Sequence, residues 1–334
     1  MDCRPVSPAR GASALRLAAR AAVLAVLAVA CLALPASAFD LQAHRGGRGL
    51  RPENTLAAFE NALRLGVDTL EMDAAITADG VVVVCHDPAL NPAITRDGEG
   101  RWLRDRPLIR SLTLAELQTY RLGRIDPANA YAGSFPTQAA QDNERVPTLA
   151  AVFALVASLG ADHVRFDIET KVFPDHPEWT IDPDTFTRKL LDVIRAAGMT
   201  KRVMIQSFDW KTHKLVQELE PGMDTVYLSA PSNLDAGGRW TLGMLPGAYP
   251  SVGHMVKAAG GTIWSPAFQM LSAGDLKTAQ QLGLKVVPWT VNDPRDMDRL
   301  IGWGVDGLIS DYPDRVRAAM QASGMSLPSP VSPR

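Results

Sequence analysis

Residues 44–87 read HRGGRGLRPENTLAAFENALRLGVDTLEMDAAITADGVVVVCHD, and this stretch carries the clearest signals for the fold. The apolar run 41–43 directly before it predicts a short strand, which ends where the glycines of the HRGG segment let the backbone turn. Apolar residues then recur at helical spacing over 54–65, and a glycine follows as a stop signal. The stretch therefore begins as a strand, a loop and a helix, with polar residues at the carboxyl end of the strand.

Two more strands are predicted in the second half of this stretch. Side chains alternate across a strand, so Glu71 and Asp73 in the first of them point to the same side. Two carboxylates on one face repel each other, which indicates a metal or a paired base between them. The valine-rich run 81–85 is typical of a strand buried on both faces. Three strand ends thus deliver polar side chains, namely His44, Arg45, Glu71, Asp73, His86 and Asp87.

Five short motifs lie in this stretch: H-R-G at 44–46, P-E-N-T at 52–55, E-x-D at 71–73, D-G at 79–80 and H-D at 86–87. Each motif alone is weak. In this order and spacing they resemble the signature of the glycerophosphodiester phosphodiesterase family, which belongs to the phosphatidylinositol-phospholipase-C-like phosphodiesterase barrels. Segments at 207–208, 289–292 and 304–313 also resemble later family motifs, so the resemblance spans about residues 40–315.

Helices and strands alternate again from about residue 146 almost to the end of the chain. This rhythm favours a parallel sheet, and its many repeats favour a closed (β/α)8 TIM barrel over residues 39–320, followed by a tail at 321–334. The sequence has nine strand-like runs, but the barrel has eight strands, so at least one run is not a strand or lies outside the barrel. We expect this run to be one of the pair 69–73 and 81–85, which has no helix between its members. Residues 88–145 are rich in turn formers and predict a small insertion after the third strand, over the site.

The first 38 residues predict an export signal. Four arginines precede an unbroken apolar run over 21–34, and the A-S-A sequence at 36–38 offers a cleavage site. The run is shorter than the roughly 20 residues of a membrane span. We therefore expect a signal peptide at 1–38 and a periplasmic or secreted protein, with a lipid anchor at Cys31 as the alternative.

Charge and cysteine content narrow the classes of partner. The chain has 34 Lys and Arg and 36 Asp and Glu; without residues 1–38, which hold four arginines and one aspartate, the formal charge is −5. A mildly acidic domain argues against a nucleic-acid surface. The one cysteine then remaining, Cys85, excludes an intramolecular disulfide and is interpreted as a core residue. The sequence contains no basic amphipathic segment of the kind that docks on membranes, so the expected partner is a small molecule.

A divalent cation is the expected cofactor. Asp167, Glu169 and Lys171 share one face at the end of a predicted strand over 163–170. Glu71, Asp73 and Glu169 then form an all-oxygen ligand set, which suits Ca²⁺ or Mg²⁺ better than zinc. The family resemblance implies the same three metal ligands.

The remaining site residues follow from what phosphodiester cleavage requires. His44 and His86 are the expected general acid and base, in an order that stays open, and Arg45 and Lys171 offer positive charge to the phosphate. The attacking oxygen is water or the neighbouring glycerol hydroxyl. Three further substrate-binding candidates, each with a purely structural alternative, are Glu53, Phe208 and Trp289.

The resemblance implies metal-dependent hydrolysis of glycerophosphodiesters to sn-glycerol 3-phosphate and an alcohol. One alternative is a phospholipase that acts on lysolipids or phosphoinositides, which would need an apolar rim. Another is a non-catalytic binding protein on the same barrel. That alternative predicts a missing member of the constellation, whereas every member is present in the sequence.

Overall fold

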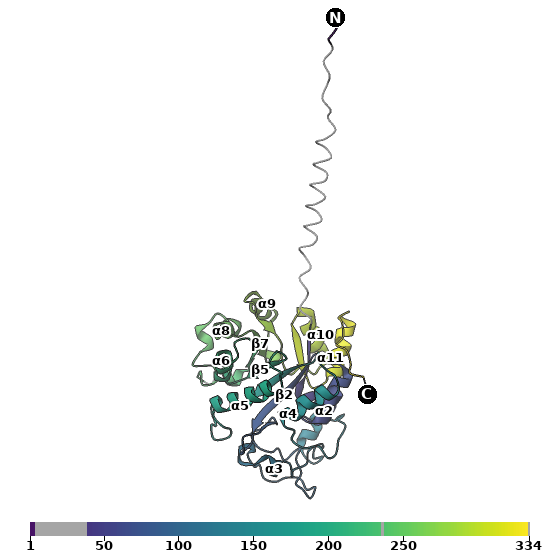
Figure 1. Cartoon of the computed structure of the whole chain (residues 1–334), viewed down its shortest axis with the longest axis vertical. Coiled ribbons are helices and arrows are strands. Elements are labelled where there is room, and N and C mark those ends of the chain that lie inside the picture. The colour runs from purple at the N-terminus through teal and green to yellow at the C-terminus, as the bar shows by residue number, and fades with distance from the viewer. Residues whose placement is uncertain (4–38, 235–236, 333–334) are drawn as a thin grey trace. The chain divides into compact units, whose positions relative to one another are not determined.

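The computed structural model describes residues 1–3, 39–234 and 237–332. The chain divides into two units, 1–38 and 39–334, and the second is the folded domain drawn in Figure 1. The predicted export signal, including Cys31, falls in residues 4–38, outside the described residues. None of the described helices combines the length and the apolarity that crossing a bilayer requires.

The described residues form a barrel of eight parallel strands that follow one another in chain order. The last strand in the chain pairs with the first. On its other side, the Ile309 N–H of the last strand donates a hydrogen bond (3.1 Å) to the carbonyl of Pro288, which follows the seventh barrel strand. The predicted TIM barrel is therefore confirmed. Its strands are β1 Asp40–Ala43, β2 Thr69–Ile76, β4 Arg165–Thr170, β5 Val203–Ser207, β6 Thr225–Ser229, β7 Ile263–Pro266, β8 Lys285–Val286 and β9 Gly307–Ser310.

Of the nine predicted strands, the one that lies outside the barrel is β3 (Val82–Val84). It pairs antiparallel with the far end of β2, where Ala74 lies opposite Val84. A turn at Gly80, whose φ of 82° suits glycine, reverses the chain between the two strands. Because β3 runs back towards the point where β2 leaves the barrel, it returns His86 to the barrel mouth.

Helices cover the outside of the barrel, as Figure 1 shows. Neighbouring helices pack in pairs, α2 with α4, α5 with α6, α8 with α9 and α10 with α11. Capping side chains set several starts: Thr55 accepts from the Ala58 N–H at α2, and Asp182 from the Thr185 N–H at α5. The helices are α2 Leu56–Leu65, α3 Leu114–Leu117, α4 Leu149–Ser158, α5 Pro183–Ala196, α6 Trp210–Leu219, α7 Pro231–Leu234, α8 Val252–Ala258, α9 Ala273–Gln281, α10 Pro294–Trp303 and α11 Pro313–Ala322.

Residues 88–145 contain the short helix α3 and 3-10 turns, and they pack outside β3. Their apolar side chains form a second small core with Val83, separate from the main core under the barrel helices. Helix α3 is a single turn, closed by a capping box between Thr113 and Glu116. The chain beyond α11 also packs on the domain, because the Val331 N–H donates to the Leu63 carbonyl (3.0 Å).

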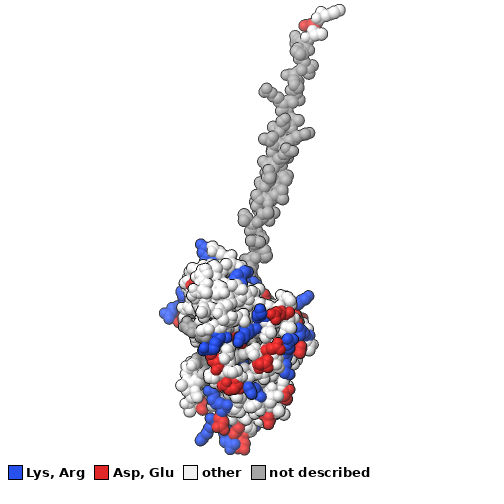
Figure 2. All heavy atoms as spheres, turned by 90° about the vertical axis from the view of Figure 1, so that its left-hand side faces the viewer, with Lys and Arg blue, Asp and Glu red and all other residues white. Residues whose placement is uncertain are grey.

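On the face shown in Figure 2, Lys and Arg lie interspersed with Asp and Glu rather than sorted by sign. A continuous basic stripe, which nucleic-acid binding would favour, is not present on that face.

Candidate active site

Three carboxylates meet at the carboxyl ends of β2 and β4. Strand pairing places Asp73 beside Glu169, and Glu71 lies two residues earlier on β2, on the same side as Asp73. One oxygen from each of these residues lies within 4.8 Å of the others, and all three side chains are buried. The sequence-predicted metal ligands therefore lie together.

This acidic group carries more negative charge than its neighbours balance. The Arg45 N–H (2.7 Å) and the Gln206 amide (2.6 Å) donate to Glu71. Even so, burial and the nearby Asp73 raise the pKa of Glu71 well above its usual range, and burial raises the pKa of Glu169 to about 7. The Oδ1 atom of Asp73 lies 3.1 Å from the Lys171 ammonium. A buried set of three carboxylates, which offers only oxygen ligands, fits a hard divalent cation.

Two buried cations border the acidic group. The Lys171 Nζ lies 2.7 Å from Glu169 and 3.1 Å from Asp73. Arg45 lies 3.3 Å from Asp73 and pairs with Glu53 at 2.8 Å. Glu53, which also accepts a hydrogen bond from the Tyr131 hydroxyl, thus contacts Arg45 rather than the acidic group.

His44 is held by a carboxylate from the opposite end of the chain. Its Nδ1 lies 2.5 Å from Asp311, just after β9, and its Nε2 lies 4.0 Å from Glu71. Asp311 also accepts from Arg48 (2.7 Å) and from the Asn292 amide (2.7 Å). Burial opposes ionisation of Asp311, but His44 and Arg48 outweigh it and lower the pKa of Asp311. Burial in turn lowers the pKa of His44, so its imidazole is neutral near pH 7.

His86 has a similar arrangement with the residue that follows it. Its Nδ1 lies 2.7 Å from Asp87. Burial, followed by the charges of Lys171 and Arg45, lowers the pKa of His86 to about 4. Both histidines therefore form an Nδ1 contact with an aspartate, which fixes the ring and leaves Nε2 for other chemistry.

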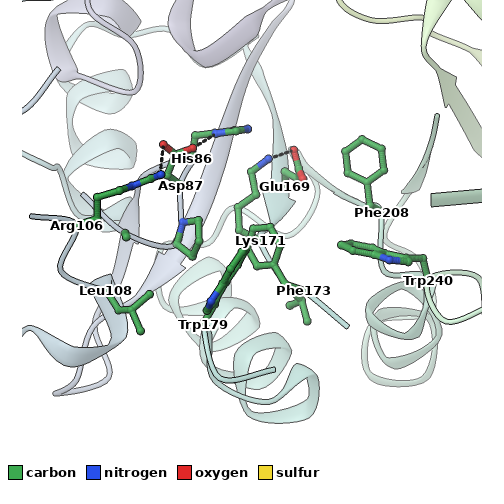
Figure 3. A pocket seen from close by; sticks show the side chains of 13 residues that line it. His86, Asp87, Arg106, Leu108, Glu169, Lys171, Phe173, Trp179, Phe208 and Trp240 are labelled. Carbon is green, nitrogen blue, oxygen red and sulfur yellow. Dashed lines mark hydrogen bonds and ion pairs between the residues drawn. The ribbon is translucent and has the colours of Figure 1, made fainter. Parts of the chain in front are cut away.

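Most of the predicted site residues line one small cavity of about 110 Å³ at the barrel mouth. Phe208 and Trp289 form part of its wall, with their ring centroids 5.4 Å apart. The predicted residues that line it are His44, Arg45, Glu71, His86, Glu169, Lys171, Phe208 and Trp289. Asp73 lies behind them in the acidic group. A larger cavity of about 570 Å³ adjoins it and shares His86, Glu169 and Lys171 (Figure 3).

The sequence analysis did not single out several polar partners of these residues. Asn54 donates to Asp73 (2.8 Å). It belongs to the P-E-N-T motif and has a left-handed backbone (φ 55°), which asparagine adopts more readily than most residues, so its place in the motif could have indicated a special role. Asp311 and Asn292 lie in the late segments with family-like motifs. Gln206, at the end of β5, had no such signal.

Comparisons with known proteins agree with this geometry. The sequence profile of the glycerophosphoryl diester phosphodiesterase family matches residues 44–315. A glycerophosphodiester phosphodiesterase of Bacillus subtilis is 29% identical over 276 residues, which cover 81% of this chain and 83% of the relative. A crystal structure from Silicibacter pomeroyi, provisionally named a glycerophosphoryl diester phosphodiesterase, is 34% identical, with a TM-score of 0.80, over 87% of this chain and 95% of that one.

A more distant structure shares the fold. The Oleispira antarctica phosphodiesterase, solved in complex with its product sn-glycerol 3-phosphate, is 19% identical, with a TM-score of 0.62. The match covers 84% of this chain and 96% of that protein.

Proposed function

The chain belongs to the glycerophosphoryl diester phosphodiesterase family, and from that membership we propose that it hydrolyses glycerophosphodiesters to sn-glycerol 3-phosphate and an alcohol. The proposed reaction depends on a divalent cation held by Glu71, Asp73 and Glu169, and on proton transfer by His44 and His86. The distant Oleispira antarctica phosphodiesterase, with sn-glycerol 3-phosphate as its product, supports the choice of product.

One observation carries this proposal: the charged groups that phosphodiester cleavage needs meet at one mouth. Residues that follow β1, lie on β2, lie on or directly after β4, and follow β3 converge there, although they are up to 127 positions apart in the chain, from His44 to Lys171. Clustering of this kind, with several shifted pKa values in a concave site, is typical of active sites.

The acidic group is the proposed cation site. Its ligands are all carboxylate oxygens, which favours Ca²⁺ or Mg²⁺. A bound cation would neutralise charge on the non-bridging phosphate oxygens. Lys171 and Arg45, which are held in place by Asp73, Glu169 and Glu53, add positive charge beside the same phosphate.

The two histidines supply the proposed proton transfers. Each ring is fixed through Nδ1 by an aspartate, so Nε2 is the atom that accepts or donates the proton. Both imidazoles are neutral in the free protein, and the negative charge of a bound phosphodiester favours protonation of the one that acts as the acid. Either water or the glycerol hydroxyl can serve as the attacking oxygen in this arrangement.

A non-catalytic role has no support in the site. Loss of chemistry on a retained barrel would leave a gap in the charged cluster, whereas the three acids, both histidines and both cations are present and lie at one cavity. The phospholipase alternative has one specific observation in its favour, the large aromatic cavity beside His86.

Hydrolysis of glycerophosphocholine by the purified full chain tests the proposal. We expect release of sn-glycerol 3-phosphate that stops with EDTA and returns with Ca²⁺ or Mg²⁺. His44→Ala and His86→Ala should each lower kcat at least about 100-fold, because general acid–base catalysis contributes about 10²- to 10⁴-fold. His163→Ala is the matched control, since that histidine is exposed and lies outside the cavity.

Two results would contradict parts of the proposal separately. Full activity in EDTA would remove the metal. Unchanged turnover in either histidine variant, with the melting temperature preserved, would remove the acid–base assignment.

A further inference from the structure

The cavity of about 570 Å³ beside the active site has walls of a different character. Its catalytic edge is charged, and Arg106 lies beside Asp87 at that edge, but the rest of its wall is aromatic or aliphatic (Figure 3). Phe173 and Trp179 come from the loop between β4 and α5, and Trp240 comes from the segment between β6 and α8. Pro88 and Leu108 complete the wall from the 88–145 segment.

The aromatic wall is held in place by contacts between these loops. The Trp240 indole N–H donates to Asp175 (2.8 Å), which links the loop after β4 to the segment after β6. Trp179 stacks on His176 at 3.8 Å, and Phe173 meets Trp179 edge-on at 5.5 Å. A wall fixed in advance lowers the entropic cost of binding, which distinguishes a ligand site from a gap between loops.

The charges at the cavity argue against a cationic ligand. Asp87 and Glu169 are the carboxylates among its described lining residues, and both lie at the catalytic edge (Figure 3). Asp87 contacts His86, and Glu169 contacts Lys171. A quaternary ammonium group in this cavity would contact aromatic rings, but both carboxylates are already paired with other residues. The Lys171 ammonium would also repel it.

The volume of the cavity also argues against a small polar head group as its ligand. A volume of about 570 Å³ corresponds to roughly 20 water-sized groups, and the adjoining polar cavity of about 110 Å³ to roughly four. A small polar head group would leave most of the larger cavity to water against apolar walls. An apolar chain would cover those walls instead.

We propose that this cavity binds an uncharged apolar arm of the phosphodiester and makes the enzyme selective for substrates that carry one. The inference rests on the hydrolytic function proposed above and specifies its substrate class. The arm continues from a phosphate held at the polar cavity, because the two cavities share His86, Glu169, Lys171 and Phe208. An alkyl group on the alcohol and an acyl chain on the glycerol have the same chemistry, and both are tested.

Two pairs of substrates test the proposal on the full chain. The first pair is sn-glycerol 3-phosphate esterified with ethanol or with octanol. The second is glycerophosphocholine and its octanoyl derivative, in which the chain is on the glycerol. Burying each added methylene favours binding about fourfold at most, so we expect at least about a tenfold rise in kcat/KM for the long member of one pair. The pair that responds identifies which half of the substrate enters the cavity.

Variants connect that preference to the aromatic wall. Trp179→Ala and Trp240→Ala should each lower the long-to-short ratio of kcat/KM about tenfold, and Trp179→Phe should recover part of it. Trp303→Ala is the matched control, a half-buried tryptophan on α10 that contacts Arg299 and does not line the cavity; it should keep the wild-type ratio. Melting temperatures report whether each variant is folded.

Binding without turnover separates this inference from the proposed function. In EDTA, intrinsic fluorescence should report tighter binding of the long ester by about tenfold, and Trp240→Ala should remove that difference. If neither the short nor the long esters are hydrolysed, the proposed function fails while the titration still tests the cavity. If they are hydrolysed but both pairs show ratios near one, or if glycerophosphocholine is preferred over the ethyl and octyl esters, the cavity proposal is overturned.

Discussion

Asp311→Asn is the substitution that best separates orientation of His44 from the rest of the site. Asp311 accepts hydrogen bonds from three donors, His44, Arg48 and the side-chain amide of Asn292. Asparagine has nearly the same shape but offers one acceptor oxygen and one donor group. At least one contact must therefore place two donors face to face in a buried site, or the Asn292 amide must turn and lose its bond from the Asp311 N–H.

The size of the effect follows from those contacts. A hydrogen bond to a charged group contributes about 1.5–3 kcal/mol, and a carboxylate also selects the imidazole tautomer with a free Nε2. His44 and Arg48 both contact Oδ1 of Asp311, so an asparagine whose oxygen takes that place loses only the charge, about 1.5–3 kcal/mol. If the new amide group faces Nδ1 instead, the tautomer is lost as well and the barrier rises by about 3–5 kcal/mol. The expected fall in kcat therefore lies between about 10-fold and 10⁴-fold. Because Asp311 acts through His44 and does not line the cavity, KM should change little.

Steady-state kinetics on glycerophosphocholine, with thermal unfolding in parallel, measures this. Asp209→Asn is the matched control, because Asp209 is a buried aspartate that caps α6 away from the small cavity, and asparagine also caps helices well. A folded Asp311→Asn variant that keeps more than a third of the wild-type kcat would refute the orienting role of Asp311.

Three further predictions concern the metal and the fold. Glu71→Gln should abolish the rise in melting temperature that Ca²⁺ or Mg²⁺ gives the wild type; an equal rise in the variant would exclude Glu71 as a ligand. Gly307→Ala should destabilise the chain by at least about 1–3 kcal/mol in urea unfolding, because the new Cβ would lie 2.4 Å from the Asp40 carbonyl oxygen. His213 is buried, and burial lowers its pKa to about 3, whereas the unfolded chain takes up a proton near pH 6.5. Its contribution to stability is therefore complete above pH 6.5 and should fall by about 2 kcal/mol between pH 7 and pH 5, and His213→Gln should flatten that part of the urea-unfolding profile.

Local sequence patterns were sufficient to predict the barrel and the acidic group. Alternation of helices and strands fixes the class of sheet, and Glu71 and Asp73 share a side because of strand geometry alone. The missing helix between 69–73 and 81–85 marked this pair as the place where one strand lies outside the barrel, as β3 does, but the sequence could not say which of the two runs that is or how it pairs. A short valine-rich run looks the same in a barrel strand and in a strand added to the end of β2, and the structure shows that only its pairing partner differs.

The two histidine contacts show where sequence information ends. Asp87 follows His86 directly, so their contact is visible in the sequence. Asp311 is 267 positions from His44, and the two meet because β9 closes the barrel beside β1. That contact depends on the tertiary structure, as does the approach of Trp179 and Trp240 to one cavity from two separate loops.

The site therefore separates reaction chemistry from substrate selection by structural element. The acids, the lysine and the contact between His44 and Asp311 lie on or directly after barrel strands, whose pairing and burial fix their positions. The aromatic wall comes from two loops and the 88–145 segment, which the barrel does not constrain in the same way. Substitutions in the loops can change the arm that is accepted while the charged cluster stays intact. A substitution at Glu71, Asp73 or Glu169 alters the charge balance itself, because Asp73 and Glu169 contact the Lys171 ammonium and Glu71 belongs to the same buried acidic group.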